Sequence, residues 1–376
     1  MHIKFIEDRA LEVFTTLNLL WEEKKQGQGI FKDVVLSQDR WPEPKDRVEL
    51  ANYLACAALF MRGGVISDDP FKWLYALQEK VPEMFDPKVV AEDWTPKRIE
   101  STIRKITPKL LNKEDAGTEE NGAGALGFNV KTHTISWQEN LTTLHNYWGD
   151  NVLNVFWGVT EFEEAFRRID HKRNIAGFKG MRRKIFSLLT IWLQERELVP
   201  IFPTPIPIDH HALRVLLATN SIEVKDHKVP TVLAEKYEML ADQLVFRRTE
   251  QLVDDIMKWS QSFLIEHDLS YLNVNPAIWV LSRDFCSGQL QNTSRQDGKF
   301  YFTPEILRKN PNLWPKKYRD PCSYCPLEHL CTGVVPVRPH SKNSLVVRME
   351  RVPYPNPMLS GFGKQLPYPG RRKSVK

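Results

Sequence analysis

The chain has 376 residues, of which 42% are hydrophobic and 26% charged, a composition typical of globular proteins that allows about two domains. No apolar run is long enough to cross a bilayer, and the N-terminus MHIKFIEDRALEVF lacks the apolar stretch of a signal peptide. We therefore expect an intracellular protein, cytoplasmic or nucleoid-associated, with no membrane partner. In a reducing compartment, five cysteines of which three cluster favour a metal site over disulfides.

Helical periodicity dominates the chain, and few segments show the alternation of a strand. The first amphipathic pattern has charged residues on one face and Leu11, Phe14, Leu17 and Leu20 on the other. An almost wholly apolar pattern at 46–62 ends at Gly63 and Gly64, and its Cys56 is expected to be a buried small hydrophobe. The expected helices cover 8–25, 46–62, 71–81, 137–170, 210–218 and 232–266, so the chain is predicted to be all-α.

Three segments interrupt this pattern. Residues 112–129, NKEDAGTEENGAGALGFN, have low complexity and are predicted to form a mobile loop. Prolines at 200–209 predict an extended run before the next helix. The end of the chain, from Val337, has nine Lys or Arg against one Glu, with six prolines, so it is expected to be a basic, irregular extension. Such a tail contacts nucleic acid or is simply solvated.

A basic turn containing two glycines precedes a strongly apolar helix. In 177-GFKGMRRK-184, Gly177 and Gly180 would let a phosphate approach the backbone, and the following helix N-terminus would favour an anion. The positive side chains around this turn are Lys172, Arg173, Lys179, Arg182, Arg183 and Lys184. The pattern indicates a nucleic-acid contact or, alternatively, a helical hairpin with a solvated basic face.

A carboxylate stands where the Pro-rich run meets the next helix. In 206-IPIDHHALR-214, Asp209 is an N-cap residue by position. It either caps the helix and does nothing more, or is also held facing a cleft.

The three clustered cysteines have the spacing Cys322-x2-Cys325-x5-Cys331, which suits zinc or an iron–sulfur cluster. A fourth thiolate is needed for either centre. Because Cys56 belongs to an apolar helix, Cys286 is the plausible fourth ligand.

Taken in this order, the turn and the aspartate resemble motifs of the endonuclease III branch of the helix–hairpin–helix (HhH-GPD) DNA glycosylases. The family's hairpin LPGVGRKTA is similar to 178-FKGMRRKIF-186, with Gly180 on the first glycine and Lys184 on the lysine. Its VDTHxxR segment is similar to 208-IDHHALR-214, with Asp209 on the catalytic aspartate and His211 and Arg214 in register.

The cysteines carry the rest of the resemblance, which spans residues 46–335. The family pattern C-x6-C-x2-C-x5-C matches in its last three cysteines, and SRDFC, ending at Cys286, resembles the GRxxC that supplies the first. Here 35 residues separate Cys286 from Cys322. A further departure is Arg182 in place of the second hairpin glycine, which predicts a less tight turn or a shift of register onto Gly177.

The resemblance implies two helical domains with a cleft between a six-helix domain and an iron–sulfur cluster domain. The implied domains are 45–195, with an insertion at about 107–140, and a discontinuous domain of 1–44 with 196–335, followed by the extension 336–376. It also implies a monomer that binds double-stranded DNA through Gly177, Lys179, Gly180, Arg182, Arg183, His211 and Arg214.

The implied activity is excision of a damaged, mispaired or modified base after the base is flipped out of the duplex. Asp209 would stabilise the oxocarbenium-like transition state, and Lys184 is the residue for an additional lyase step. Cys286, Cys322, Cys325 and Cys331 would hold a structural [4Fe–4S] cluster, with zinc as the alternative. Two other interpretations keep the fold: a non-catalytic nucleic-acid-binding protein, and an enzyme acting on RNA or a nucleoside.

Overall fold

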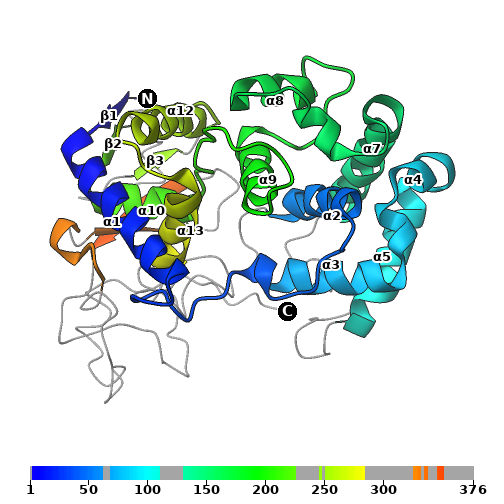
Figure 1. The fold of residues 1–376 in the computed structure, drawn as a ribbon, viewed down its shortest axis with the longest axis horizontal. Helices are drawn as coiled ribbons and strands as arrows, with labels where there is room; N and C mark the ends of the chain where they lie inside the picture. The colour runs from blue at the N-terminus through cyan, green and yellow to red at the C-terminus, as the bar shows by residue number, and fades with distance from the viewer. Residues whose placement is uncertain are drawn as a thin grey trace, which may run out of the picture. The chain divides into compact units, whose positions relative to one another are not determined.

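The computed structural model describes residues 2–61, 68–110, 130–225, 245–247, 250–283, 325–331, 334–337 and 345–350. These residues are predominantly helical, which confirms the predicted all-α class at that coarse level. The chain divides into two compact units, one formed by residues 33–207 and the other by residues 1–32 with 208–376. Figure 1 draws both units and labels their helices and strands where there is room. None of the helices within the described residues is both long and apolar enough to span a membrane.

The regular elements of the 33–207 unit are all helices within the described residues. Its elements are η1 (Ser37–Asp39), α2 (Arg47–Phe60), α3 (Asp68–Lys80), η2 (Pro82–Phe85), α4 (Pro87–Asp93), α5 (Pro96–Leu110), α7 (Val130–Trp148), η3 (Val152–Phe156), α8 (Phe162–Ile169) and α9 (Arg183–Glu195).

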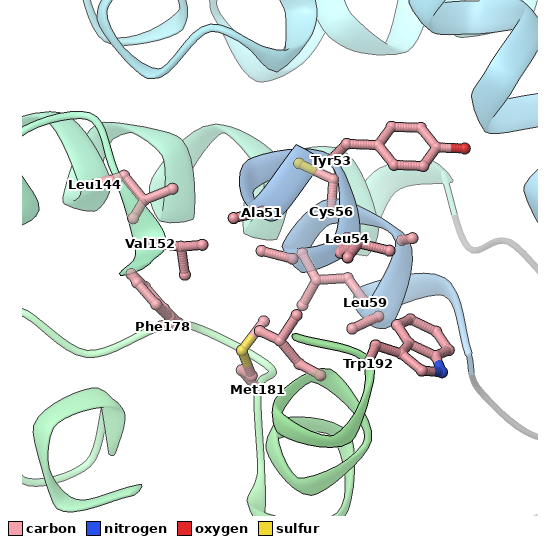
Figure 2. Packing of buried hydrophobic residues seen from close by; sticks show 14 of the residues in the cluster. Ala51, Tyr53, Leu54, Cys56, Leu59, Leu144, Val152, Phe178, Met181 and Trp192 are labelled. Carbon is pink, nitrogen blue, oxygen red and sulfur yellow. The ribbon is translucent and has the colours of Figure 1, made fainter. Parts of the chain in front are cut away.

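Helix α2 is the centre of this unit. Every residue from Ala51 to Phe60 is buried, and the helix contacts α3, α7 and α9. This follows from the sequence, because ANYLACAALF has no charged residue and can be buried on all sides. Asp46 begins the helix by accepting hydrogen bonds from the amides of Val48 and Glu49. Figure 2 shows the α2 residues, with Cys56 among them, in one apolar cluster with Phe178 and Met181.

Two sets of polar contacts fasten loops of this unit to α9. Arg196, just after the helix, forms a mostly buried ion pair with both carboxylate oxygens of Glu43. The Pro-rich run has no regular secondary structure from 200 to 209, as predicted, and returns along α9. Gln194 donates to the carbonyls of Pro200 and Phe202, both at 3.1 Å, and Ser187 donates to the carbonyl of Pro205.

The other unit combines helices with short strands. It contains β1 (His2–Phe5), α1 (Glu7–Lys25), α10 (His210–Ala218), β2 (Ile222–Lys225), β3 (Val245–Arg247), α12 (Glu250–Glu266), α13 (Tyr271–Leu281), η9 (Glu328–Leu330), β4 (Val334–Val337) and β5 (Leu345–Glu350). Strands β1 and β2 pair antiparallel, with Phe5 opposite Ile222, while a second antiparallel sheet has the order β3-β5-β4. Strand β4 contacts α10.

Helix α1 packs along α13, as Figure 1 shows. A polar network crosses this interface around Asn273, which is buried. Its side chain accepts from Lys25 Nζ at 2.7 Å and donates to Asn18 at 3.0 Å. A buried amide whose donors and acceptor are all used fixes the register of the two helices.

Several predicted segments differ from the described ones. The compact units meet at 32/33 and 207/208, whereas the predicted domain boundaries are at 44/45 and 195/196. Glu43 and the Pro-rich run, which lie between the two sets of boundaries, are bonded to the α9 region. Residues 345–350, within the segment expected to be irregular, form β5. Residues 112–129 lie outside the described residues, as do 232–244 and 248–249 of the expected helix 232–266, and 338–344 and 351–376 of the tail. Within that expected helix, residues 245–247 form strand β3, and α12 begins at Glu250.

The Glu43–Arg196 pair generates a stability prediction. Glu43→Ala should lower the free energy of unfolding by about 2–3 kcal/mol, because it leaves a mostly buried guanidinium without its carboxylate. The matched control is Glu100→Ala, which removes an exposed i,i+4 pair with Arg104 and should cost about 0.5 kcal/mol or less. Urea unfolding followed by circular dichroism measures both values; equal losses would contradict a structural role for the Glu43 pair.

Candidate functional site

The basic turn is a helical hairpin between α8 and α9. Its two ends are joined where the amide of Phe178 donates to the carbonyl of Ile169 at 2.9 Å, and buried Phe178 and Met181 anchor the turn in the core. Gly180 has φ +79°, a left-handed conformation that favours glycine. The turn therefore has the geometry in which a phosphate can approach the main chain.

Gly177 is needed for a different reason. A Cβ built on it would lie 2.5 Å from the N and Cα atoms of His171, so a side chain would collide with the backbone across the hairpin. Arg182, by contrast, is extended at φ −78° and ψ 170°, a conformation open to any residue. The left-handed position is thus at Gly180, and the turn closes without a glycine at 182.

Residues on α7 hold the hairpin from the side. Asn140 accepts from the amide of Lys179 at 2.6 Å and donates to the carbonyl of the same residue at 3.1 Å. The Lys179 ammonium pairs with Glu139 at 2.8 Å. The hairpin is therefore fixed in place by main-chain bonds, and the charge of Lys179 is partly neutralised.

The positive side chains at the start of α9 differ in their surroundings. The guanidinium of Arg183 is mostly buried, forms two hydrogen bonds with Glu163 and lies over the ring of Phe166. Arg182 is exposed and Lys184 is half-buried in the first turn of the helix. Arg183 thus has a structural partner in Glu163, and DNA contact by any of the three stays a prediction.

Asp209 is the N-cap of α10. Its Oδ1 accepts from the amides of His211 at 2.7 Å and Ala212 at 3.0 Å, and its side chain is half-buried. The cap role predicted from sequence is confirmed. Two backbone donors fix one carboxylate oxygen, so the group is held in a single orientation.

Helix α10 is bound to the end of α13 through Ser282, which is fully buried. His211 Nδ1 lies 3.1 Å from Ser282 Oγ, and Arg214 Nη1 donates to the Ser282 carbonyl at 3.3 Å. Arg214 is itself buried. These contacts give both predicted DNA-binding residues a packing role beside Asp209, and their contact with DNA stays a prediction.

Ser282 and Trp279 also belong to this region, although neither was predicted to have a role. The Trp279 ring meets His211 edge-on at 6.0 Å and lies under the guanidinium of Arg283 at 4.4 Å. The i,i+4 spacing of Trp279 and Arg283 was a readable signal for their stacking. The partners of Ser282 are 68 and 71 residues away in the chain, and no local pattern marks them.

Two of the four predicted metal ligands are described. Cys325 and Cys331 are half-buried at either end of a one-turn loop held by buried Leu327 and Leu330. The amide of Cys331 donates to the Leu327 carbonyl at 3.0 Å, which closes the loop. Thiols presented by such a closed turn fit a thiolate-bound metal in donor chemistry.

The remaining three cysteines are Cys56 and the predicted ligands Cys286 and Cys322. Cys286 and Cys322 lie outside the described residues. Cys56 is buried in α2, as predicted, and burial raises the pKa of its thiol, which keeps it protonated at neutral pH. A protonated, enclosed thiol is a poor ligand, which agrees with leaving Cys56 out of the metal site.

The comparisons with known proteins add no assignment. No protein-family model matches the chain, and no curated protein matches it.

Proposed function

We propose that the protein is a DNA N-glycosylase that removes a damaged, mispaired or modified base from double-stranded DNA. The observation that carries the proposal is the setting of Asp209: a half-buried carboxylate fixed by two amides at the start of α10. Pro205, four residues before Asp209 in the Pro-rich run, accepts a hydrogen bond from Ser187 of α9. A carboxylate held in one orientation is the group that stabilises a cationic sugar.

The hairpin supplies the proposed contact with the DNA backbone. Gly180 has no side chain to keep a phosphate from the turn, and the N-terminus of α9 favours an anion. Arg182 and Lys184 add positive charge at the same place. Because these contacts involve the phosphates, they position the duplex without selecting a base.

The proposed reaction is hydrolysis of the bond between the base and C1′ of the deoxyribose. The base is first turned out of the duplex. As the C1′–N bond breaks, positive charge develops on the sugar, and the anionic carboxylate of Asp209 stabilises it. The carboxylate then takes a proton from the water that bonds to C1′, while the base leaves with a proton from solvent.

Lys184 is the proposed nucleophile for a second activity. Its neutral amine would attack C1′ in place of water and displace the base. The sugar ring would then open as the C1′–O4′ bond breaks, with O4′ taking the amine proton, to give a Schiff base. Elimination from the Schiff base breaks the bond to the 3′ phosphate, and water hydrolyses the Schiff base to release Lys184.

We further propose that Cys286, Cys322, Cys325 and Cys331 hold a [4Fe–4S] cluster, with zinc as the alternative. The group would supply a cross-link within the fold and take no part in the hydrolysis.

Asp209→Asn should abolish base release while DNA affinity changes less than about threefold, since an uncharged amide cannot stabilise the cationic sugar but still caps the helix. The measurement is base release and binding over a panel of duplexes, each with a different lesion. Asp46→Asn is the matched control, because Asp46 caps α2 through the same two kinds of amide bond and should leave base release unchanged. Base release that survives in Asp209→Asn contradicts the mechanism, and binding without release from any substrate supports the non-catalytic interpretation.

Lys184→Ala should remove the borohydride-trapped protein–DNA adduct of a lyase while base release continues, because only the Schiff base is lost. Lys258→Ala, which removes an exposed lysine of α12 outside the hairpin, is the control and should retain the adduct. Trapping that persists in Lys184→Ala assigns the nucleophile to another residue.

The protein purified without oxygen should be brown, absorb near about 400 nm and contain iron. Cys286→Ala and Cys325→Ala should both lose the metal, whereas Cys56→Ala should keep it, since its thiol is enclosed in α2. Metal analysis and visible spectra measure this. A colourless protein with one stoichiometric zinc contradicts the iron–sulfur proposal, and metal loss in Cys56→Ala contradicts the choice of ligands.

A further inference from the structure

Trp157 and Ile175 are the most exposed large hydrophobic side chains among the described residues, at 79% and 77% exposure. Both belong to the unit of residues 33–207, Trp157 directly after η3 and Ile175 in the α8–α9 hairpin. Burying a tryptophan side chain stabilises a fold, so a tryptophan that stays exposed to solvent indicates a binding role.

The backbone around Trp157 is fixed, which makes its outward position a property of the fold. Its amide donates to the Asn154 carbonyl at 3.3 Å, and its own carbonyl accepts from Arg168 at 2.7 Å. Its neighbours Val155 and Phe156 are buried in the core. Since the turn is anchored on both sides, the indole is held outward on a rigid support.

Hydrogen bonds tie this turn to the hairpin loop that carries Ile175. Arg168 donates to the Trp157 carbonyl, and its own carbonyl accepts from Asn174 at 2.8 Å. Trp148 makes a second link, because its ring nitrogen donates to the Ala176 carbonyl at 2.9 Å and its carbonyl accepts from Asn154 at 2.8 Å. The 154–157 turn and the 174–176 loop are therefore bonded to the same two residues.

The charge of the hairpin indicates the class of partner. Between Arg167 and Lys184 there are eight Lys or Arg residues and one acidic residue, Asp170. Glutamates from outside this stretch pair with four of these residues, Arg167, Arg168, Lys179 and Arg183, and Asp170 pairs with Arg173. Lys172 is exposed, and within the described part of the chain it has no ion pair. A flat apolar ring beside net positive charge is complementary to nucleic acid, which offers phosphates and the faces of bases together.

We infer that Trp157 is a stacking platform for an unpaired base in DNA bound at the hairpin, with Lys172 contacting an adjacent phosphate. The inference rests on the proposed DNA contact of the hairpin and adds to it a preference for DNA in which a base near that contact is unpaired. In an intact duplex the bases are already stacked on one another, so the indole gains little there.

The test compares binding of a plain duplex with binding of the same duplex carrying a short unpaired bubble, both followed by fluorescence anisotropy. Trp157→Ala should weaken binding of the bubble DNA about 5- to 100-fold, the range of one lost base–aromatic stack, and binding of the duplex less than about twofold. Trp157→Phe should restore most of the affinity, because phenylalanine also stacks. Ile265→Ala, which removes an exposed hydrophobic side chain from α12, is the control and should bind both DNAs like the wild type.

The salt dependence separates stacking from charge. Trp157→Ala should leave the slope of log K against log salt unchanged, whereas Lys172→Ala should reduce its magnitude by about 0.7–0.9. Equal weakening of both DNAs by Trp157→Ala, or affinities like those of the wild type, overturns the stacking inference while the proposed glycosylase function stands. Wild-type protein that binds neither DNA contradicts both.

Discussion

The buried attachment of the Pro-rich run to α9 is the constraint that fixes the last segment of the 33–207 unit. Gln194 is buried and uses its amide nitrogen on two carbonyls of the run, while its oxygen accepts from Thr204 at 3.2 Å. Because proline has no amide hydrogen, a Pro-rich run cannot form a ladder, and side chains of α9 supply its bonds instead. Helix α9 thus carries the hairpin at its start and binds residues 200–205 along its length.

Several basic side chains of the hairpin are paired with carboxylates, so its surface is less positive than its sequence. Of its positive side chains, those of Lys179, Arg168 and Arg183 have carboxylate partners from α7 or α8. These pairs fix the shape of the turn and reduce its net charge. Arg182 and Lys172 are exposed, but because those three side chains are paired, the positive charge of the hairpin at its surface is smaller than the count of its basic residues indicates.

Local chemistry made much of the fold predictable. The apolar run of α2, the cap at Asp209 and the extended prolines are properties of a few neighbouring residues, and each was predicted from them. The clamp of Asn140 on Lys179 joins residues 39 apart, and the bond of His211 to Ser282 joins residues 71 apart. No periodicity encodes such pairs, since the packing of whole helices brings them together. The exposure of Trp157 was unpredictable for the same reason, because an aromatic-rich helical stretch normally indicates a core.

Capping geometry alone does not distinguish Asp209 from Asp46, since each accepts two amide bonds through Oδ1. The surroundings do distinguish them. Asp46 is exposed and begins α2, whose residues from Ala51 onward are buried in the core. Asp209 is half-buried, and the His211 and Arg214 that follow it form hydrogen bonds with Ser282. Arg214 is buried, so its guanidinium needs a fixed partner, and the Ser282 carbonyl supplies one. Asp209 therefore caps a helix that is fastened to the end of α13 by polar contacts with buried Ser282, which separates it from a cap such as Asp46.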